Sequence, residues 1–410
     1  MRKQTTENAG AAARRVYADY NATAPLRPEV RAAIIEDLDV YGNASSMHLS
    51  GRLARKRVEE ARDMVEKLIG AGPKTAVFTS GGSEANNALF AAMQRLASAQ
   101  DGSPLREGRS EFVTSAIEHP CVLNAAKRLQ GLGFKVTFLP VDGHGKVSVA
   151  ALKEALCERT LFVSVMMANN EIGTVQDMGE ICALAKAAGA LTHTDAVQAI
   201  GKIPVNVGDL GVDYMTISAH KFYGPKGVGA LYARKGAPMF PMILGGHQEE
   251  GMRAGTYNNL GIFGFGVASA LALADVGKYG REMAPLRERL RDGLARAIPG
   301  MKVNGHPTDV LPNTLNVSFP GAEGEAILLS MDMAGIEAST GSACASGSLE
   351  PSQVLVATGL GPELAHGSIR FSLGWGTDID DVDYIIETLP PIVARLRAIS
   401  SVDSTGGSYV

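Results

Sequence analysis

Residues Leu161–Ala196 read LFVSVMMANNEIGTVQDMGEICALAKAAGALTHTDA, and this stretch decides the fold. Its two ends, Leu161–Met167 and Leu191–Ala196, are short runs of apolar and β-branched residues that are typical of strands. Between them, EICALAKAAG has the composition of a helix. Strand, helix and strand in this order predict a βαβ unit, in which the two strands are parallel.

The same alternation extends to both sides of this unit. Further strand-like runs are Ala76–Ser80, Glu111–Ala116, Lys135–Pro140, Tyr214–Ala219 and Gly229–Ala233. Helical patterns such as EANNALFAAMQRLASA and CVLNAAKRLQGLG lie between them. Continuous apolar strands alternating with helices predict an α/β fold, with a mostly parallel central sheet covered by helices on both faces.

The last third of the chain has a different pattern. A long helical stretch runs from about Ile262 to Ala297, and we expect a break near Gly277 or Gly280. It is followed by NTLNVSFP, a helix near Glu325–Ala334, a cysteine-containing loop and IRFSLG, which together predict a smaller α+β domain. The expected organisation is a disordered tail (1–15), a large domain (16–272) whose first residues pack with the small one, a small C-terminal domain (273–398) and a flexible tail (399–410).

Composition excludes several classes of protein. The 410 residues carry a net charge of −4, which gives no electrostatic footprint for nucleic acid or an anionic membrane. The first segment lacks the apolar core of a signal peptide, and no apolar run reaches the roughly 18 residues of a spanning helix. Four cysteines without a C-x-x-C pair indicate neither a disulfide framework nor a zinc site, so no metal is expected. A reducing compartment, the cytoplasm, is the simplest reading.

Polar residues follow the predicted strands at their carboxyl ends, where open α/β sheets bind ligands. Ser80–Glu84 follows one strand and opens a helix, so its glycines and Ser83 could hold a phosphate at the helix N-terminus. An ordinary serine-capped turn is the alternative. Lys221, in SAHKFYGPKG, could form a Schiff base with a carbonyl cofactor, with Lys226 as a rival, although most lysines are surface charges.

Three further residues fit a pyridoxal cofactor. Asp195 could pair with a pyridinium nitrogen and Gln198 could reach the phenolic oxygen of the same ring, although an N-cap aspartate is common. His119 could stack on the ring and move protons, or it could be an ordinary core histidine. Arg370 lies in an apolar strand-like run and needs a carboxylate partner, either a substrate carboxylate or a structural salt bridge.

The cysteines divide into two groups. Cys344 lies in STGSACASGSLEP, a run of small polar residues that predicts a loop able to approach a substrate. Cys121 reads as a small buried hydrophobe, and Cys157 and Cys182 fall in helical patterns and read as packing residues.

In their joint order these segments resemble the pyridoxal-phosphate-dependent cysteine desulfurases of the NifS/IscS-like group, which have the fold-type I architecture. The resemblance runs from about Tyr17 to Leu396. It is carried by ADYNATAPLRPEV, YGNASSMHLSGR, FTSGGSEANN, EHPCVL, ANNEIGTVQD, THTDAVQAIGK, SAHKFYGPKGVGALY, GGHQEEGMRAGT, SGSACASGSLEPSQVL and AHGSIRFSLG. The cysteine loop distinguishes the desulfurases from other members of the fold.

The resemblance implies roles for individual residues. Lys221 carries pyridoxal 5′-phosphate as a Schiff base, Asp195 and Gln198 hold its ring, and His119 stacks on it. The residues implied for phosphate binding are Gly82, Ser83, Ser218 and His220, with Thr256 reaching the phosphate of the neighbouring subunit in a homodimer. Those implied for chemistry on L-cysteine are Asn170 and Arg370, which hold its carboxylate, and Cys344, whose thiolate takes the sulfur as a persulfide for an iron–sulfur scaffold or another acceptor.

Three positions depart from the pattern of many relatives: Ala44 where proline is common, Ser83 where threonine is common, and Trp375 where arginine is common. Two other functions share part of the pattern. A selenocysteine lyase or another fold-type I enzyme would leave Cys344 incidental, and its activity would survive loss of that thiol. A non-catalytic sulfur carrier would be colourless, whereas a lysine-bound pyridoxal cofactor absorbs visible light.

Overall fold

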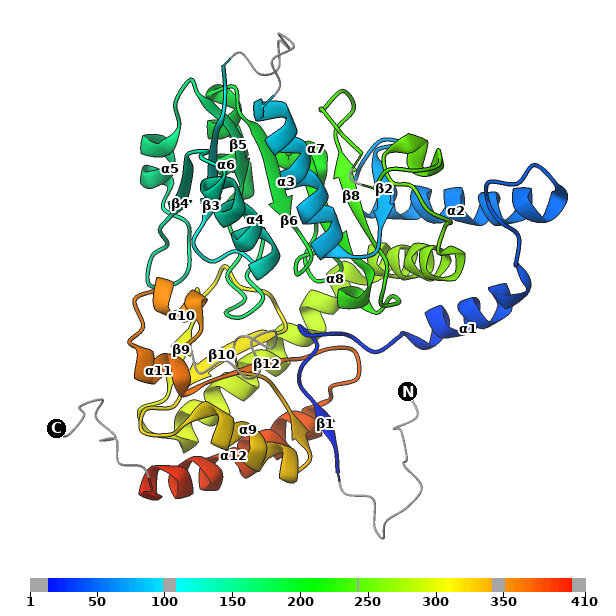
Figure 1. Cartoon of the computed structure of the whole chain (residues 1–410). Coiled ribbons are helices and arrows are strands. Elements are labelled where there is room, and N and C mark those ends of the chain that lie inside the picture. The colour runs from blue at the N-terminus through cyan, green and yellow to red at the C-terminus, as the bar shows by residue number, and fades with distance from the viewer. Residues whose placement is uncertain (1–13, 99–107, 242, 341–350, 400–410) are drawn as a thin grey trace.

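The computed structural model describes residues 14–98, 108–241, 243–340 and 351–399. Most of both predicted tails, and the predicted nucleophile Cys344, lie outside these residues. The fold is α/β with a mostly parallel central sheet, as predicted. A seven-stranded sheet with its helices occupies the upper part of Figure 1, and a three-stranded sheet with its own helices lies below it. The domain boundaries near residues 272 and 398 stay a prediction.

The large sheet has the strand order β2–β8–β7–β6–β5–β3–β4. Only β8 is antiparallel to its neighbours, and every other adjacent pair is parallel. The strands are β2 (Ala76–Thr79), β3 (Glu111–Ser115), β4 (Val136–Leu139), β5 (Thr160–Ser164), β6 (Leu191–Asp195), β7 (Tyr214–Ser218) and β8 (Gly229–Ala233). The strand predicted to reach Met167 ends earlier, at Ser164, and the N–H of Met166 donates to the Glu118 side chain (2.8 Å) instead of to a neighbouring strand.

Helices cover both faces of this sheet because successive strand residues point to opposite sides. On β5, Phe162 packs in one core cluster with α3 (Gly82–Ser98) and α4 (Pro120–Gly131). Its neighbour Val163 packs in the other cluster, with α2 (Leu49–Leu68) and α6 (Met178–Ala187). Shorter helices in this part are α1 (Pro28–Glu36), η1 (Asp37–Asp39), α5 (Val149–Ala155), α7 (Val207–Leu210), η2 (Ala219–Phe222) and η3 (Gln248–Gly251).

The smaller sheet has the antiparallel order β12–β10–β9, and a separate two-stranded sheet pairs β1 with β11 in parallel. This two-stranded sheet joins distant parts of the chain, because β1 lies near the N-terminus and β11 lies far along the sequence. The elements are β1 (Val16–Tyr17), β9 (Lys302–Asn304), β10 (Thr314–Ser318), β11 (Ile336–Glu337), β12 (Ser368–Ser372), α9 (Gly324–Met333), α10 (Gln353–Ala357), α11 (Pro362–His366) and α12 (Ile379–Ile399).

One helix, α8 (Asn259–Ala297), joins the two parts, and the break expected near Gly277 or Gly280 is absent. A glycine inside a helix costs only about 1 kcal/mol. Packing offsets the cost of Gly277 and Gly280. Tyr279 and Met283 are buried near them, and α8 contacts both α2 and α12. By length and composition alone α8 is also apolar enough to cross a membrane. The core helices of globular proteins can be equally long and apolar, and α8 packs against α1, α2 and α12.

Candidate active site

The carboxyl ends of the parallel strands meet at one edge of the large sheet, facing the smaller sheet in Figure 1. The segments that follow β2, β3, β5, β6 and β7 carry the predicted phosphate loop, His119, Asn170, Asp195 and Lys221 respectively. Hydrogen bonds link two of these side chains through α3, because the Asn86 amide donates to Asp195 Oδ2 and also lies 3.2 Å from Cys121 Sγ, which is 3.0 Å from His119 Nδ1.

The loop from β2 to α3 is built for close approach. A Cβ on Gly82 would lie 3.0 Å from Val197 Cγ2, and a Cβ on Gly229 would lie 2.8 Å from the Cα of Gly81. Gly229 therefore has no room for a side chain, and a Cβ on Gly82 would fit only if Val197 moved slightly. Glu84 holds the loop, since its Oε2 accepts the N–H of Ser80 at 2.9 Å. The first turn of α3, with the exposed Ser83, then presents N–H groups suited to an anion.

Asp195 is buried at the end of β6 and is held from two sides. Its Oδ2 accepts from the amide of Asn86 at 2.7 Å, and its Oδ1 accepts the N–H of Val197 at 3.0 Å. The carboxylate thus caps the following turn and also has a partner from α3. The Oδ1 of the fully buried Asn86 has no hydrogen-bond partner among the residues that the structure describes. A buried orphan acceptor of this kind indicates a place for a ligand or water.

Lys221 lies in η2, directly after β7, and is half-buried. Its Nζ donates to the main-chain oxygens of Asn21 (2.6 Å) and Ala22 (2.8 Å), which belong to the segment after β1. The next turn is strained, because Tyr223 adopts the left-handed region with φ of 71°. Lys226, the rival lysine, is exposed in the following turn. Of these two lysines, Lys221 is therefore the one whose side chain points into the molecule.

His119 is the N-cap of α4, where its Nδ1 accepts the N–H of Cys121 at 3.2 Å. Burial is the main cause that lowers the pKa of His119, Asp195 opposes this, and Lys221 lowers it further. The ring is therefore neutral near pH 7. With Nδ1 accepting, the ring proton of the neutral form is on Nε2.

One of the predictions for the described cysteines, that for Cys157, is wrong. Cys121 packs partly buried against a core cluster, in line with its prediction, and its Sγ also lies 3.0 Å from His119 Nδ1 and 3.2 Å from the amide nitrogen of Asn86. Burial raises the pKa of its thiol to about 12, so it is a poor nucleophile at neutral pH. Cys157 is exposed, because α5 ends at Ala155 before reaching it. Cys182 is buried in α6, as predicted.

Ser218 and His220 flank the end of β7 close to Lys221. Ser218 is buried, and its Cβ would lie 3.8 Å from a Cβ placed on Gly82, so the two segments are adjacent. His220 Nδ1 lies 3.2 Å from Thr23 Oγ1. Burial, and then the nearby Lys221, lower the pKa of His220 to about 4. His220 is therefore a neutral hydrogen-bonding group at physiological pH.

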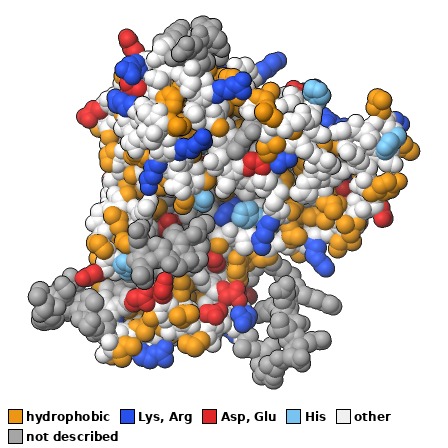
Figure 2. All heavy atoms as spheres, in the orientation of Figure 1, with side chains coloured by type: hydrophobic (Ala, Val, Ile, Leu, Met, Phe, Trp, Pro, Cys, Tyr) orange, Lys and Arg blue, Asp and Glu red, His pale blue; other side chains and the backbone are white. Residues whose placement is uncertain are grey.

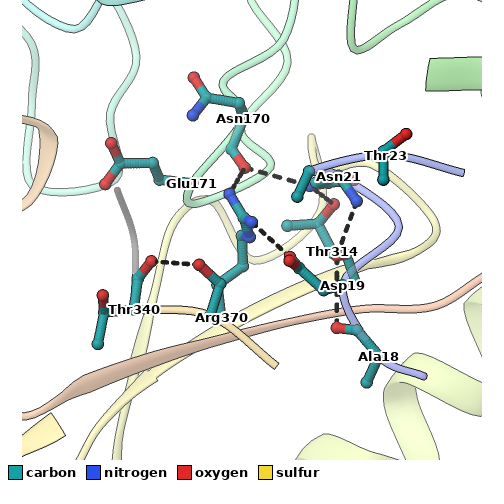
Figure 3. Close-up of polar contacts among 12 residues, drawn as sticks. Ala18, Asp19, Asn21, Thr23, Asn170, Glu171, Thr314, Thr340 and Arg370 are labelled. Carbon is teal, nitrogen blue, oxygen red and sulfur yellow. Dashed lines mark hydrogen bonds and ion pairs between the residues drawn. The ribbon is translucent and has the colours of Figure 1, made fainter. Parts of the chain in front are cut away.

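Arg370 is buried in β12 and reaches across to the large sheet's edge (Figure 3). Its Nη2 donates to Asp19 Oδ1 at 2.6 Å, and its Nη1 donates to the main-chain oxygen of Asn170 at 3.1 Å. Of the two alternatives left open by the sequence, the salt bridge is thus present, while the grip on a substrate carboxylate stays a prediction. In Figure 3 the Asn170 amide points away from Arg370.

Sequence reasoning missed four residues of this site: Asp19, Asn21, Cys121 and Lys202. The signal for two of them was adjacency to predicted residues, because Cys121 follows His119 by two positions and Lys202 follows Gln198 by four. Asp19 and Asn21 lie in ADYNATAPLRPEV, where nothing but resemblance marked a role. Thr256 is exposed on the loop before α8, and this loop contacts the start of α3 through the Arg253–Glu84 ion pair. Cys344 lies outside the described residues.

Pyridoxal phosphate fits the residues that the structure describes. The glycine loop opens α3 with free N–H groups, and the orphan oxygen of Asn86 belongs to the amide that holds Asp195, the expected ring partner. An amine, a carboxylate and an imidazole are the groups that hold this cofactor by covalent attachment, pairing and stacking.

The chain matches the aminotransferase class-V family over residues 16–385. It is 48% identical over 388 residues to a protein named cysteine desulfurase IscS from Dictyoglomus turgidum, covering 94% of this chain and 96% of that one. It is 47% identical over 386 residues to cysteine desulfurase 2 of Trichormus variabilis, covering 94% of each. A solved NifS-like protein superposes with a TM-score of 0.86 at 36% identity, covering 93% of this chain and all of that one.

The chain therefore belongs to the aminotransferase class-V family. Within it, the relatives place the chain in the NifS/IscS-like group of pyridoxal-phosphate-dependent cysteine desulfurases, as the sequence predicted.

Proposed function

We propose that this enzyme converts L-cysteine to L-alanine at the edge of the large sheet, with Lys221, Asp195 and His119 as its central groups. The observation that carries the proposal is that the Asn86 amide contacts both Asp195 and the Cys121 thiol beside His119, while Lys221 follows the neighbouring strand β7. A solved relative described as SspA in complex with cysteine, 32% identical with a TM-score of 0.74 and covering 87% of this chain and 98% of that one, supports the choice of substrate.

Pyridoxal phosphate, bound to Lys221, would supply an electron sink that makes the substrate Cα proton acidic and the Cβ–S bond breakable. Asp195 would hold the ring nitrogen, because a buried carboxylate favours a cation beside it. The Lys221 amine would act as the base that moves the Cα proton. The Nε2–H of His119 would donate a hydrogen bond at the reacting end, since its Nδ1 is engaged by α4.

The phosphate and the substrate carboxylate have separate positions in this proposal. Gly82, Ser83, Ser218 and His220 bind the phosphate at the start of α3. Arg370 holds the substrate carboxylate, sharing its guanidinium with Asp19, and Asn170 assists. The two groups come from opposite parts of the fold, so the substrate lies between the large and small sheets.

Cys344 is the proposed sulfur acceptor, and described residues on either side of its segment are fixed near the substrate site. Ser339 pairs through its backbone with Arg370, at 3.2 and 2.6 Å. Ser352 donates to Glu171, the neighbour of Asn170. The Cys344 thiolate attacks the substrate sulfur, the Cβ–S bond breaks, and Cβ takes a proton. L-Cysteine and one thiol thus become L-alanine and one persulfide, which passes to an iron–sulfur scaffold or another thiol-bearing acceptor, in the cytoplasm.

The test of this function is product stoichiometry. With L-cysteine and a thiol reductant, we expect the pyridoxal-phosphate-loaded protein to release alanine and sulfide in equal amounts and to absorb visible light. A colourless protein that releases neither product would refute it. Sulfide accompanied by pyruvate instead of alanine would indicate a different lyase reaction, and activity confined to selenocysteine would favour the selenocysteine lyase.

A homodimer is the second part of the proposal, with Thr256 reaching the phosphate bound by the other subunit. Its support is an exposed apolar arm, residues 35–53, which runs from the end of α1 into α2 and lies on the right of Figures 1 and 2. Tyr41 and Met47 are 85% and 90% exposed, and Asn259 donates to Gly42, so the loop of Thr256 adjoins the arm. Such a patch on a free surface indicates an interface.

We expect Met47→Asp to weaken this dimer. Burying a carboxylate in an apolar interface costs about 1.4 kcal/mol or more, so the dimer dissociation constant should rise at least ~10-fold. Light scattering across a concentration series measures it. Met333→Asp is the matched control, because Met333 is also highly exposed but lies on α9, away from the arm. Native protein that stays a 43.0 kDa monomer at every concentration would rule the dimer out.

A further inference from the structure

Lys202 is a buried lysine next to the site, and no role has been given to it above. It follows Gln198 by one helical turn's spacing, and only 3% of its surface is exposed. Among the described residues no carboxylate lies within ion-pair distance of its Nζ. Burying a lysine without an opposite charge is unfavourable, so its two hydrogen bonds must have a specific use.

Both partners of Lys202 are side-chain amide oxygens. Its Nζ donates to Gln198 Oε1 at 2.5 Å and to Asn21 Oδ1 at 2.8 Å. Burial, and then the charges of Lys221 and Arg370, lower the pKa of Lys202 well below its usual value. Even an uncharged amine keeps two N–H groups, which is enough for these two oxygens. As the donor to both oxygens, the Lys202 amine favours the orientation in which the oxygen of each amide, and not its nitrogen, faces it.

The fixed orientation determines where the donors of Gln198 point. Because Oε1 faces Lys202, Nε2 must face the opposite way, and it donates to the main-chain oxygen of Asn21 at 2.9 Å. The same oxygen accepts from Lys221 Nζ at 2.6 Å. An amide nitrogen carries two hydrogens, so Gln198 has a second N–H for another acceptor in the neighbourhood of Lys221, where the cofactor would attach.

We propose that Lys202 is a positioning residue: it locks the Gln198 amide so that an N–H, and not the carbonyl oxygen, meets the phenolic oxygen of the bound cofactor. This rests on the proposed role of Gln198 as a ring ligand. Without Lys202 only the hydrogen bond to the main-chain oxygen of Asn21 holds the amide orientation. The turned-over amide, with Oε1 facing the phenolic oxygen and no hydrogen between them, would then become more populated.

The consequence is spectroscopic. A hydrogen bond donated to the phenolic oxygen favours its anionic form and therefore lowers the pH at which the lysine-bound cofactor titrates. In Lys202→Met, which retains length and apolar packing but has no N–H, we expect the midpoint of the visible absorbance titration to rise by about one pH unit, a tenfold change in the proton equilibrium. The measurement is made on purified holoenzyme without substrate.

A double-mutant cycle tests whether Lys202 acts through Gln198. Gln198→Ala should raise the midpoint by itself, and adding Lys202→Met to Gln198→Ala should change it no further. A merely structural lysine would lower the melting temperature and cofactor occupancy in both backgrounds and leave the midpoint unchanged. If Lys202→Met does not fold, Lys202→Gln enters the same cycle, since it retains a donor and should shift the midpoint less than one unit.

The outcomes separate this proposal from the proposed function. An unchanged midpoint in the folded Lys202 variant overturns the proposal, and so does a shift that is equally large in the Gln198→Ala background. An unchanged midpoint in Gln198→Ala alone also overturns it, because Gln198 would then not contact the ring oxygen. Native protein that binds no pyridoxal phosphate would instead refute the function itself.

Discussion

Lys221→Ala should abolish the visible absorbance of the purified protein and reduce alanine release from L-cysteine by at least ~100-fold. The loss has two causes, because Lys221 is both the proposed attachment point of the cofactor and the base that moves the Cα proton. Proton transfer by a positioned group alone contributes 10²- to 10⁴-fold. The absorbance spectrum and the alanine assay, on protein reconstituted with excess pyridoxal phosphate, measure both effects.

Lys226→Ala is the matched control for this prediction. Lys226 lies five residues on, in the same strand-to-strand connection, but its side chain is exposed and not directed at Asn21. It should keep its colour and its activity. Lys221→Ala also removes a donor from two main-chain oxygens, which costs about 1–3 kcal/mol of stability. Melting temperatures are therefore compared as well. Full colour in Lys221→Ala and its loss in Lys226→Ala would reverse the assignment.

The carboxyl-edge groups were predictable because each follows a strand that its own residues reveal. Asp195 and Lys221 come directly after runs of buried β-formers, and parallel strands bring such positions to one edge whatever the details of packing. The position of the glycine loop was predictable for the same reason, although its residues alone fit an ordinary serine-capped turn equally well.

The contacts across the two sheets were not predictable in this way. Arg370 pairs with Asp19, which lies 351 positions earlier, and Asn21 receives Lys221, Gln198 and Lys202 together. A repeating sequence pattern reports only on residues that are close together in the chain. These residues come into contact only when β1 joins the smaller part of the fold. Gly277 and Gly280 show the opposite failure: local propensity predicted a break that long-range packing of α8 removes.

Cys344→Ala should abolish alanine formation and sulfide release while leaving the cofactor absorbance intact. Without the thiolate, the substrate sulfur has no acceptor in this mechanism, so the Cβ–S bond is not broken. The colour persists because Cys344 takes no part in the proposed binding of pyridoxal phosphate. We expect alanine formation to fall at least ~100-fold, the scale on which the loss of an essential catalytic group is felt. Alanine, sulfide and the persulfide of the native protein, trapped by an alkylating reagent, are the measurements.

Cys157→Ala provides the matched control, since Cys157 is an exposed cysteine that lies away from the carboxyl edge, beside Glu111 and Thr160. It should retain alanine release, sulfide release and the trapped persulfide. Cys121→Ala answers a separate question, because that thiol lies next to His119, yet its raised pKa leaves it mostly protonated. Alanine release that continues in Cys344→Ala and stops in Cys121→Ala would transfer the sulfur-accepting role to Cys121. Unchanged release in both variants would make a sulfur-accepting thiol unnecessary and favour a selenocysteine lyase or another fold-type I reaction at the same edge of the sheet.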